Sequence, residues 1–432
     1  MAAKVTDLRS ALKMLEDMPG QLIETDVEVE PMAELSGVYR HVGAGGTVMR
    51  PTKEGPAMIF NNVKGHPGAR VAIGVLASRT RVGALLECDP KDLGKKLYHS
   101  VDNPIPPVLT EEAAPCQEVV HKATDPDFDL YKLVPAPTNT PVDAGPYITL
   151  GMCYASHPDT GVSDVTIHRL CIQGKDELSI FFTPGARHIG AMAERAEELG
   201  QRLPISISIG VDPAIEIGSC FEPPTTPMGY DELAVAGALR GEPVRLCKCL
   251  TVNERAIANA EYVIEGEVLP NVRVQEDQNS HTGYAMPEFP GYTGPASDQC
   301  WMIKVTAVTH RKNPIMQTCI GPSEEHVSMA GIPTEASIYG MVILFVCLCT
   351  KIVKLDDVKD TGMFLIEIMP LMFIPAGVGL MKSWGVLKPL VVPVLAITVV
   401  SLIAVMAVSG RVSQKIIAKN DKKRESEGAL NE

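Results

Sequence analysis

Three parts of the sequence place ionisable side chains that could do chemistry in apolar surroundings. The first is SDVTIHRL, where Asp164, His168 and Arg169 lie along a predicted strand. Buried charges are normally paired, so Arg169 could equally neutralise a structural carboxylate. Because side chains alternate along a strand, Asp164 and Arg169 should point to opposite faces, and one shared site would need a bulge or separate layers of one ligand.

The second part consists of two predicted helix starts. His188 precedes the apolar repeat in RHIGAMAERAEELG, and Glu232 opens the helical pattern in DELAVAGALRG. Helix N-termini attract anions, and a histidine with carboxylates can hold a divalent metal that bridges to a phosphate. The spacing leaves open the simpler interpretation of a surface histidine and an ordinary first-turn glutamate.

The third part is VQEDQNSHTGYAMPEFPGYTG, residues 274–294, which carries Glu276, Asp277 and Glu288. Gly and Pro interrupt any regular periodicity here, so the stretch is predicted to be an ordered functional loop. A carboxylate on such a loop can act as a general acid or base once burial raises its pKa. A solvated acidic turn is the alternative interpretation.

The elements that must position these residues alternate between strand and helix. YITLGMCYAS and LPISISIGVD are predicted strands, since each is an apolar run rich in β-branched or aromatic residues. RHIGAMAERAEELG has an apolar face at helical spacing and stops at Gly200, as expected for a helix with a glycine C-cap. This mixture, with frequent turns, predicts an α+β fold.

Charge divides the chain into two parts. Residues 340–432 contain 11 Lys and Arg against 8 Asp and Glu, while residues 1–339 contain 28 basic and 44 acidic residues. The front part is therefore strongly acidic, which argues against nucleic acid as a partner. Eleven Cys occur without a C-x-x-C pair, and the N-terminus lacks an apolar signal-peptide core, so we expect a cytoplasmic front part with reduced thiols.

A resemblance covers about residues 5–336. The chain resembles the UbiD family of decarboxylases, most of all its phenolic-acid members, through the ordered runs APCQEVVHKATDPDFDLYKLVPAPTNTPVDAGPYIT, SDVTIHRL, RHIGAMAERAEELGQRLPISISIGVDPA, PPTTPMGYDELAVAGALRGEPV, ANAEYVIEGEVLPN and MPEFPGYTG. The resemblance implies a split-barrel domain, over 1–336, that binds prenylated FMN made by a UbiX-like flavin prenyltransferase. It also implies reversible, non-oxidative decarboxylation of an aromatic hydroxy acid such as hydroxybenzoate, protocatechuate or gallate. The family forms homo-oligomers through a further domain, whose path this sequence leaves near Ser337.

The resemblance also assigns roles to residues. It implies that a divalent metal, Mn²⁺ or another, holds the flavin phosphate, with K⁺ nearby. The implied metal ligands are Asp164, which stands where many relatives carry Asn, His188 and Glu232. The implied cofactor-binding residues are Thr166, Ile167, His168, Arg169, Arg187, His188, Pro227, Met228 and Glu232. The implied catalytic residues are Arg169, Glu276 and Glu288, and in this chain DQNSHTGYAMP separates the two glutamates.

Residues 337–410 have a different character. SIYGMVILFVCLCTKIV, TGMFLIEIMPLMFIPAGVGLM and KPLVVPVLAITVVSLIAVMAVSG are each apolar over about a membrane thickness, so they predict an all-α, multi-pass segment of three transmembrane helices in the cell membrane. A polar tail of basic and acidic residues follows over 411–432. The segment resembles the CidA/LrgA holin-like membrane proteins, so the alternative function is lysis regulation or export, with the chain a chimera.

Three spans would place the two ends of that segment on opposite sides of the membrane. The basic residues of the last stretch and of the first link both favour the cytoplasm under the positive-inside rule. That orientation would send the acidic front domain outward, against the cytoplasmic location that its thiols and its cofactor indicate.

Overall fold

A closed antiparallel barrel is the main element of the computed structural model, which describes residues 4–43, 54–182, 188–221, 225–287, 293–321 and 323–350. The strands follow the order β12-β9-β6-β7-β8-β15, and β15 also pairs with β12, which closes the ring. A further strand, β5, extends the sheet from β15. The bounds are β5 Val119–Lys122, β6 Tyr147–Ser156, β7 Ser163–Gly174, β8 Glu177–Ile180, β9 Leu203–Ile209, β12 Tyr262–Val274 and β15 Cys300–His310.

Smaller sheets join distant parts of the chain to this barrel. The first has the order β1-β2-β3-β16, and its last strand pairs in parallel with β3, with Ile315 opposite Arg70. The second has the order β11-β10-β4, and β13 pairs with β14. The bounds are β1 Leu22–Thr25, β2 Ala57–Phe60, β3 Arg70–Ile73, β4 Val108–Leu109, β10 Arg245–Lys248, β11 Arg255–Ile257, β13 Tyr284–Pro287, β14 Thr293–Pro295 and β16 Ile315–Thr318.

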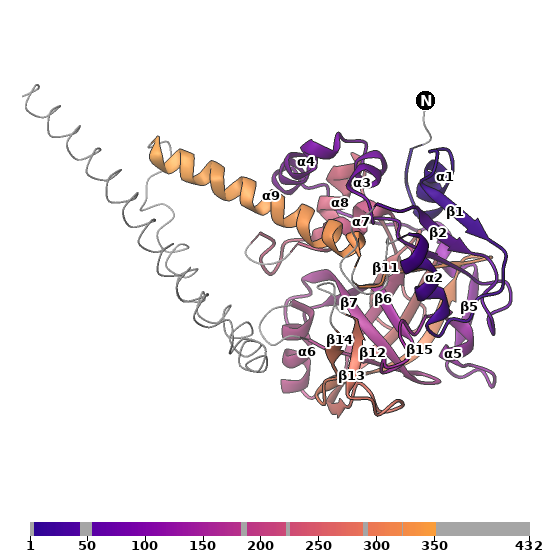
Figure 1. Ribbon diagram of the computed structural model, residues 1–432. Helices are drawn as coiled ribbons and strands as arrows, with labels where there is room; N and C mark the ends of the chain where they lie inside the picture. Colours follow the sequence, from indigo (N-terminus) through magenta and orange to yellow (C-terminus); the bar gives the residue numbers. More distant parts are fainter. Residues whose placement is uncertain are drawn as a thin grey trace, which may run out of the picture. The chain divides into compact units, whose positions relative to one another are not determined.

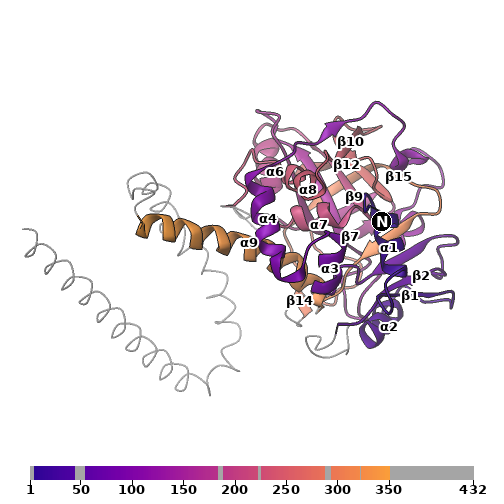
Figure 2. The same ribbon diagram turned by 90° about the horizontal axis from the view of Figure 1, so that it is seen from above.

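Helices cover the strands in separate groups. Figures 1 and 2 show α3, α4, α7 and α8 gathered together, and α8 packs against both α4 and α7. The helices are α1 Leu8–Glu16, α2 Glu34–Val42, α3 Arg79–Leu85, α4 Leu93–Asp102, α5 Leu130–Leu133, α6 His188–Glu198, α7 Pro213–Gly218, α8 Glu232–Arg240 and α9 Glu324–Cys349, with 3₁₀ turns at Pro90–Asp92 and Pro115–Gln117. The predicted α+β class and the predicted barrel are confirmed.

Local signals fixed the ends of the helices that matter for the site. Asp231 caps α8 by accepting a hydrogen bond from the Leu233 N–H, and Gly241 ends the helix in the left-handed region at φ +72°. Beyond α6, Gly200 takes φ +66°, as its predicted role in ending that helix requires. The Asp231 cap thereby fixes the start of α8, and the two glycines mark the C-terminal ends of α6 and α8.

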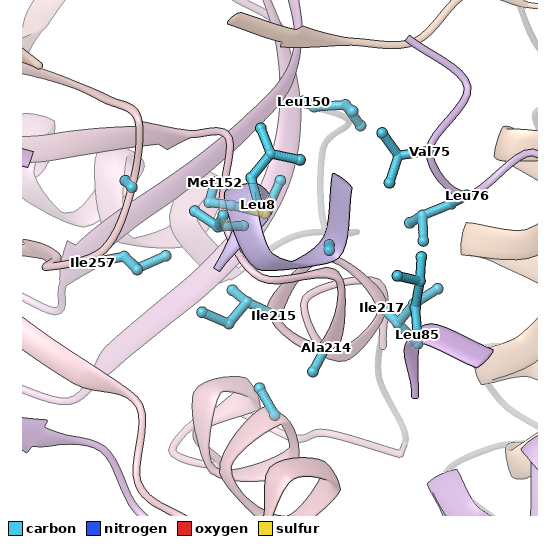
Figure 3. Close-up of a cluster of buried hydrophobic side chains, with 14 of the residues drawn as sticks. Leu8, Val75, Leu76, Leu85, Leu150, Met152, Ala214, Ile215, Ile217 and Ile257 are labelled. Atoms are coloured by element: carbon cyan, nitrogen blue, oxygen red, sulfur yellow. The ribbon is translucent and has the colours of Figure 1, made fainter. Parts of the chain in front are cut away.

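The central strand β6 is buried on both faces. After a register shift near Gly151, its side chains alternate between two apolar clusters: Met152 and Tyr154 join a cluster on the helical side, which Figure 3 shows, whereas Cys153 and Ala155 join the other. Its neighbour β7 alternates in the same way, since Val165 belongs to the first cluster and Leu170 to the second. Any charged residue on β7 therefore sits between apolar layers and must be compensated locally.

The long helix α9 crosses the predicted boundary at residues 336 and 337 without interruption. Its beginning is packed into the front part of the chain, because the buried Glu325 accepts hydrogen bonds from the Gly74 and Leu76 N–H groups at 3.0 and 2.9 Å. Farther along, Met341 is 60% exposed and Val342 is 55% exposed. Within the described ranges, Glu324–Leu344 is the one helix long and apolar enough to cross a membrane. The second and third predicted spans and the 411–432 tail lie outside the described residues.

Candidate functional site

Three side chains from distant parts of the sequence meet beside β7. The potential ligand atoms of Asp164, His188 and Glu232 all lie within 4.8 Å of one another. The His188 Nδ1 lies 2.9 Å from Asp164 Oδ1, and the Thr166 hydroxyl donates to Asp164 Oδ2 at 2.8 Å. We call Asp164, His188 and Glu232 the acidic–histidine cluster.

Secondary structure supplies each member of the acidic–histidine cluster. Asp164 lies near the start of β7, while His188 and Glu232 are the first residues of α6 and α8. Two helix N-termini therefore face one strand. An acidic residue in a first helical turn is also favoured by the helix dipole.

The cluster places two acidic side chains together in a buried position. Asp164 and Glu232 are buried, and Glu232 Oε2 has no hydrogen-bond partner among the described residues. Burial, followed by the nearby charge of Asp164, raises the pKa of Glu232 to about 9. Two carboxylates and one imidazole nitrogen form a donor set that suits a hard divalent cation such as Mn²⁺, and a cation there would relieve the repulsion. The residues present therefore fit the implied metal.

A second constellation joins Arg169 to Glu276. The Arg169 guanidinium donates to both carboxylate oxygens, with Nε 3.0 Å from Oε1 and Nη2 3.3 Å from Oε2. The Glu276 side chain is 3% exposed and that of Arg169 is 25% exposed. Arg169 can therefore reach an incoming anion while its partner stays buried, which is the geometry needed to orient a carboxylic acid.

Hydrogen bonds from several elements hold Glu276 just beyond the end of β12. Its N–H donates to the Ser297 carbonyl at 2.8 Å, and the Ser297 N–H donates to Glu276 Oε2 at 3.1 Å. The Tyr147 hydroxyl donates to Oε1 at 3.1 Å, and the Gln173 side-chain amide donates to the Glu276 carbonyl at 2.7 Å. Sequence reasoning missed these three partners. Only Tyr147 gave a signal, as a hydroxyl-bearing residue in an apolar strand.

The structure separates the two faces of β7 as strand alternation predicts. Asp164 joins the acidic–histidine cluster, whereas Arg169 joins Glu276. His168 is buried with its ring edge-to-face against Phe182 at 5.1 Å, and Ile167 is half-buried against the helical-side apolar cluster. The predicted site residues of β7 are therefore divided between the two faces of that strand.

Other predicted cofactor contacts are more dispersed. Pro227 and Met228 lie on an exposed turn before α8, where the Tyr230 N–H donates to the Pro227 carbonyl at 2.9 Å. Arg187 and Glu288 lie outside the described residues, so their roles remain predictions.

A cavity of about 780 Å³ lies away from both constellations. It is lined by residues of the three-stranded sheet and by the buried ion pair of Asp212 and Arg240. Of the predicted site residues that the structure describes, none lines it. The chemistry of the donor sets, rather than the size of this cavity, therefore identifies the candidate site.

Comparison with known proteins gives consistent matches over the front part of the chain. Residues 108–324 match the UbiD family model, described as 3-octaprenyl-4-hydroxybenzoate carboxy-lyase Rift-related domain, and residues 15–101 match the N-terminal domain of the same carboxy-lyase. A gallate decarboxylase from Lactiplantibacillus plantarum is 60% identical over 343 residues, which cover 79% of this chain and 70% of the relative. Residues 323–413 match the LrgA family model.

Solved structures agree in fold. An apo 3,4-dihydroxybenzoic acid decarboxylase from Enterobacter cloacae is 57% identical with a TM-score of 0.75, covering 78% of this chain and 69% of that one. A UbiD-class enzyme from Pelotomaculum thermopropionicum in complex with prFMN is 36% identical with a TM-score of 0.68, covering 77% and 71%.

Replacing Glu232 with Gln should abolish metal binding at the acidic–histidine cluster. Mn²⁺ at 100 times its Kd should raise the free energy of unfolding of the wild type by about 2.7 kcal/mol, and E232Q should lose this stabilisation.

The affinity for Mn²⁺ should rise with pH between about 6 and 8. Burial raises the pKa of Glu232 to about 9, so its proton must leave when the metal binds. Chemical denaturation with and without Mn²⁺ measures both effects. E276Q is the matched control and should keep the gain; equal Mn²⁺ stabilisation in E232Q would contradict the assignment.

Proposed function

The chain belongs to the UbiD family of carboxy-lyases, and from that premise we propose that it decarboxylates an aromatic hydroxy acid without net oxidation, using prenylated FMN. The reaction is the reversible exchange of a ring carboxylate for a ring proton. Gallate and protocatechuate, the 3,4-dihydroxybenzoic acid, are the preferred candidates, since relatives at 60% and 57% identity act on these acids. Hydroxybenzoate is the simpler member of the same class.

The observation that carries this proposal is that one strand, β7, contributes to both the acidic–histidine cluster and the Arg169–Glu276 pair. β7 presents Asp164 to a cluster suited to a cation, and Arg169 to a carboxylate pair suited to an organic acid. A cation beside two helix N-termini favours a phosphate, and a partly exposed guanidinium favours a carboxylate. Together they fit a phosphate-bearing cofactor and an acid substrate.

The residues described fit prenylated FMN in a limited but specific way. Asp164, His188 and Glu232 would hold the metal that binds the phosphate, with Thr166 fixing Asp164. When bound, the prenylated flavin supplies the electron sink that an aryl carbanion lacks, because that carbanion lies in the ring plane without conjugation. A flavin prenyltransferase of the UbiX type would supply the cofactor, and homo-oligomers are proposed by analogy with the family.

The protein residues then orient the acid and move protons. Arg169 would hold the substrate carboxylate while Glu276, anchored by the Tyr147 hydroxyl and the Ser297 N–H, keeps the guanidinium in place. After CO₂ leaves, a protonated carboxyl must return a proton to the ring carbon. Glu288 is proposed for this step, from its match to the family motif PEFPGY. Its carboxyl would need an apolar environment to remain protonated.

A second proposal concerns the C-terminal part, which we propose is a multi-pass membrane segment. The match to the LrgA family and the exposed apolar residues of α9 support it. Residues 325–336 of α9 contribute buried side chains to the enzyme body, and Ser337 and Tyr339 still contact Thr225 and Tyr98. The remaining described residues of the helix, 340–349, span about 15 Å, so a first span would have to continue past residue 350 to cross about 30 Å of hydrocarbon.

The decarboxylase proposal is tested by loading the full chain with cofactor. Co-expression with a flavin prenyltransferase should give a protein that retains flavin and releases CO₂ from gallate or protocatechuate. His188→Ala should lower metal affinity at least about tenfold and with it the retained flavin. His99→Ala, on the exposed surface of α4, is the control and should retain flavin. Unchanged flavin content in H188A would refute the metal assignment, and an inactive, flavin-loaded wild type would refute the reaction.

Glu288→Gln should keep the cofactor but lose turnover. If Glu288 returns the proton, the loss should be roughly 10²- to 10⁴-fold, and exchange of ring hydrogen with solvent deuterium should fall in parallel. Asp277→Asn is the matched control on the same loop, where Asp277 accepts a hydrogen bond from the Gly283 N–H. Deuterium exchange at the wild-type rate in E288Q would move the proton donor elsewhere.

The membrane proposal predicts opposite locations for the two ends of the chain. With three spans and a cytoplasmic enzyme body, the full chain should sediment with membranes. Protease added to inside-out vesicles should digest the enzyme body and spare a C-terminal tag. Right-side-out vesicles should give the converse pattern. Digestion of both ends from the same side would rule out three spans.

A further inference from the structure

The carboxylate of Glu276 receives a hydrogen bond from the Tyr147 hydroxyl, a side chain to which no role has been assigned. We propose that Tyr147 is a positioning residue, which holds the Glu276 carboxylate in register with Arg169 while an acid substrate binds. The inference rests on the proposed decarboxylase function and names a further residue for the same reaction.

Four donor contacts surround this carboxylate from different directions. Arg169 contributes two and the Ser297 N–H one, while the Tyr147 hydroxyl reaches Oε1 at 3.1 Å. Arg169 approaches from the partly exposed side, since a quarter of its side chain is accessible. Tyr147 is fully buried and approaches from the protein interior. Within the described part of the chain, Tyr147 is the uncharged side chain that donates to this carboxylate.

The ring of Tyr147 is itself held firmly. It belongs to a small buried cluster with Ala144, Cys171 and Met286, and its backbone pairs with Cys171 across β6 and β7. Its N–H donates to the Pro137 carbonyl at 3.0 Å. Burial, with smaller effects from Cys171 and Glu276, raises the pKa of the hydroxyl, so Tyr147 stays a neutral donor.

The fixed, neutral Tyr147 hydroxyl becomes important when the substrate carboxylate binds beside Glu276. Arg169 must then face both Glu276 and the substrate carboxylate, and its hold on Glu276 weakens as it turns to the substrate. Tyr147 and the Ser297 N–H remain in place because neither can follow the substrate. They keep the Glu276 carboxylate oriented. Substrate binding can then align the acid substrate without first moving Glu276.

The hydrogen bond can be tested without turnover by a double-substitution cycle on stability. Tyr147→Phe keeps the ring and removes the donor, and Glu276→Gln removes the charge. If the two groups interact, the combined loss in Y147F/E276Q should be smaller than the sum of the two single losses. Additive losses, measured by denaturant unfolding of the full chain, would overturn the inference even if the enzyme is active.

The positioning role is tested on the flavin-loaded enzyme. Y147F should lower kcat for gallate or protocatechuate roughly ten- to a hundredfold while KM and flavin content change by less than about twofold. Tyr262→Phe is the matched control, since Tyr262 is equally buried on β12 with its ring beside His310. Wild-type kcat in Y147F would overturn the inference while leaving the proposed function intact. If the wild type turns over neither acid, the proposed function fails, and the stability cycle decides whether Tyr147 holds Glu276.

Discussion

The pairing of β12 with β15 is the interaction on which the candidate site depends. It closes the barrel, with Val274 opposite Cys300 at one end of the ladder, and the chain between these strands forms the loop that carries Glu276. The hydrogen bonds between Glu276 and Ser297 continue the pairing just beyond the regular strands. Because β6 and β7 belong to the same closed ring, Tyr147, Arg169 and Gln173 reach Glu276 from fixed backbone positions.

The two constellations compensate charge in different ways. Glu276 finds its counter-ion within the protein, since Arg169 supplies a guanidinium and backbone and hydroxyl donors complete the shell. The acidic–histidine cluster instead leaves a buried carboxylate oxygen of Glu232 without a partner among the described residues. An unpaired buried carboxylate is costly, and under the proposed function a cation from outside the chain would compensate it. Glu276 therefore has its counter-ion within the protein, whereas Glu232 belongs to the proposed metal site.

Local sequence patterns predicted the helices and strands around the site. They did not predict which residues distant in the sequence come into contact. Apolar periodicity and capping residues predicted α6, α8, β6 and β7, and alternation correctly separated Asp164 from Arg169. The grouping of Arg169 with Glu276 in one site followed only from a family resemblance, since 107 residues separate them. Tyr147 and Ser297 were missed because their role depends on barrel closure, which no local pattern encodes. The start of α9 was also missed, since the burial of Glu325 reflects the Gly74–Leu76 loop rather than apolar spacing.

The parallel pairing of β16 with β3 has a consequence for biosynthesis. The sheet begun by residues 22–73 receives its last strand only from residues 315–318. One edge of that sheet therefore stays unpaired through most of translation, and an open strand edge is where nascent chains associate wrongly. About twenty residues after β16, the apolar half of α9 begins. The enzyme body thus completes its sheet shortly before an apolar helix leaves the ribosome. Under the membrane proposal, folding of the sheet would compete in time with delivery of that helix to the membrane.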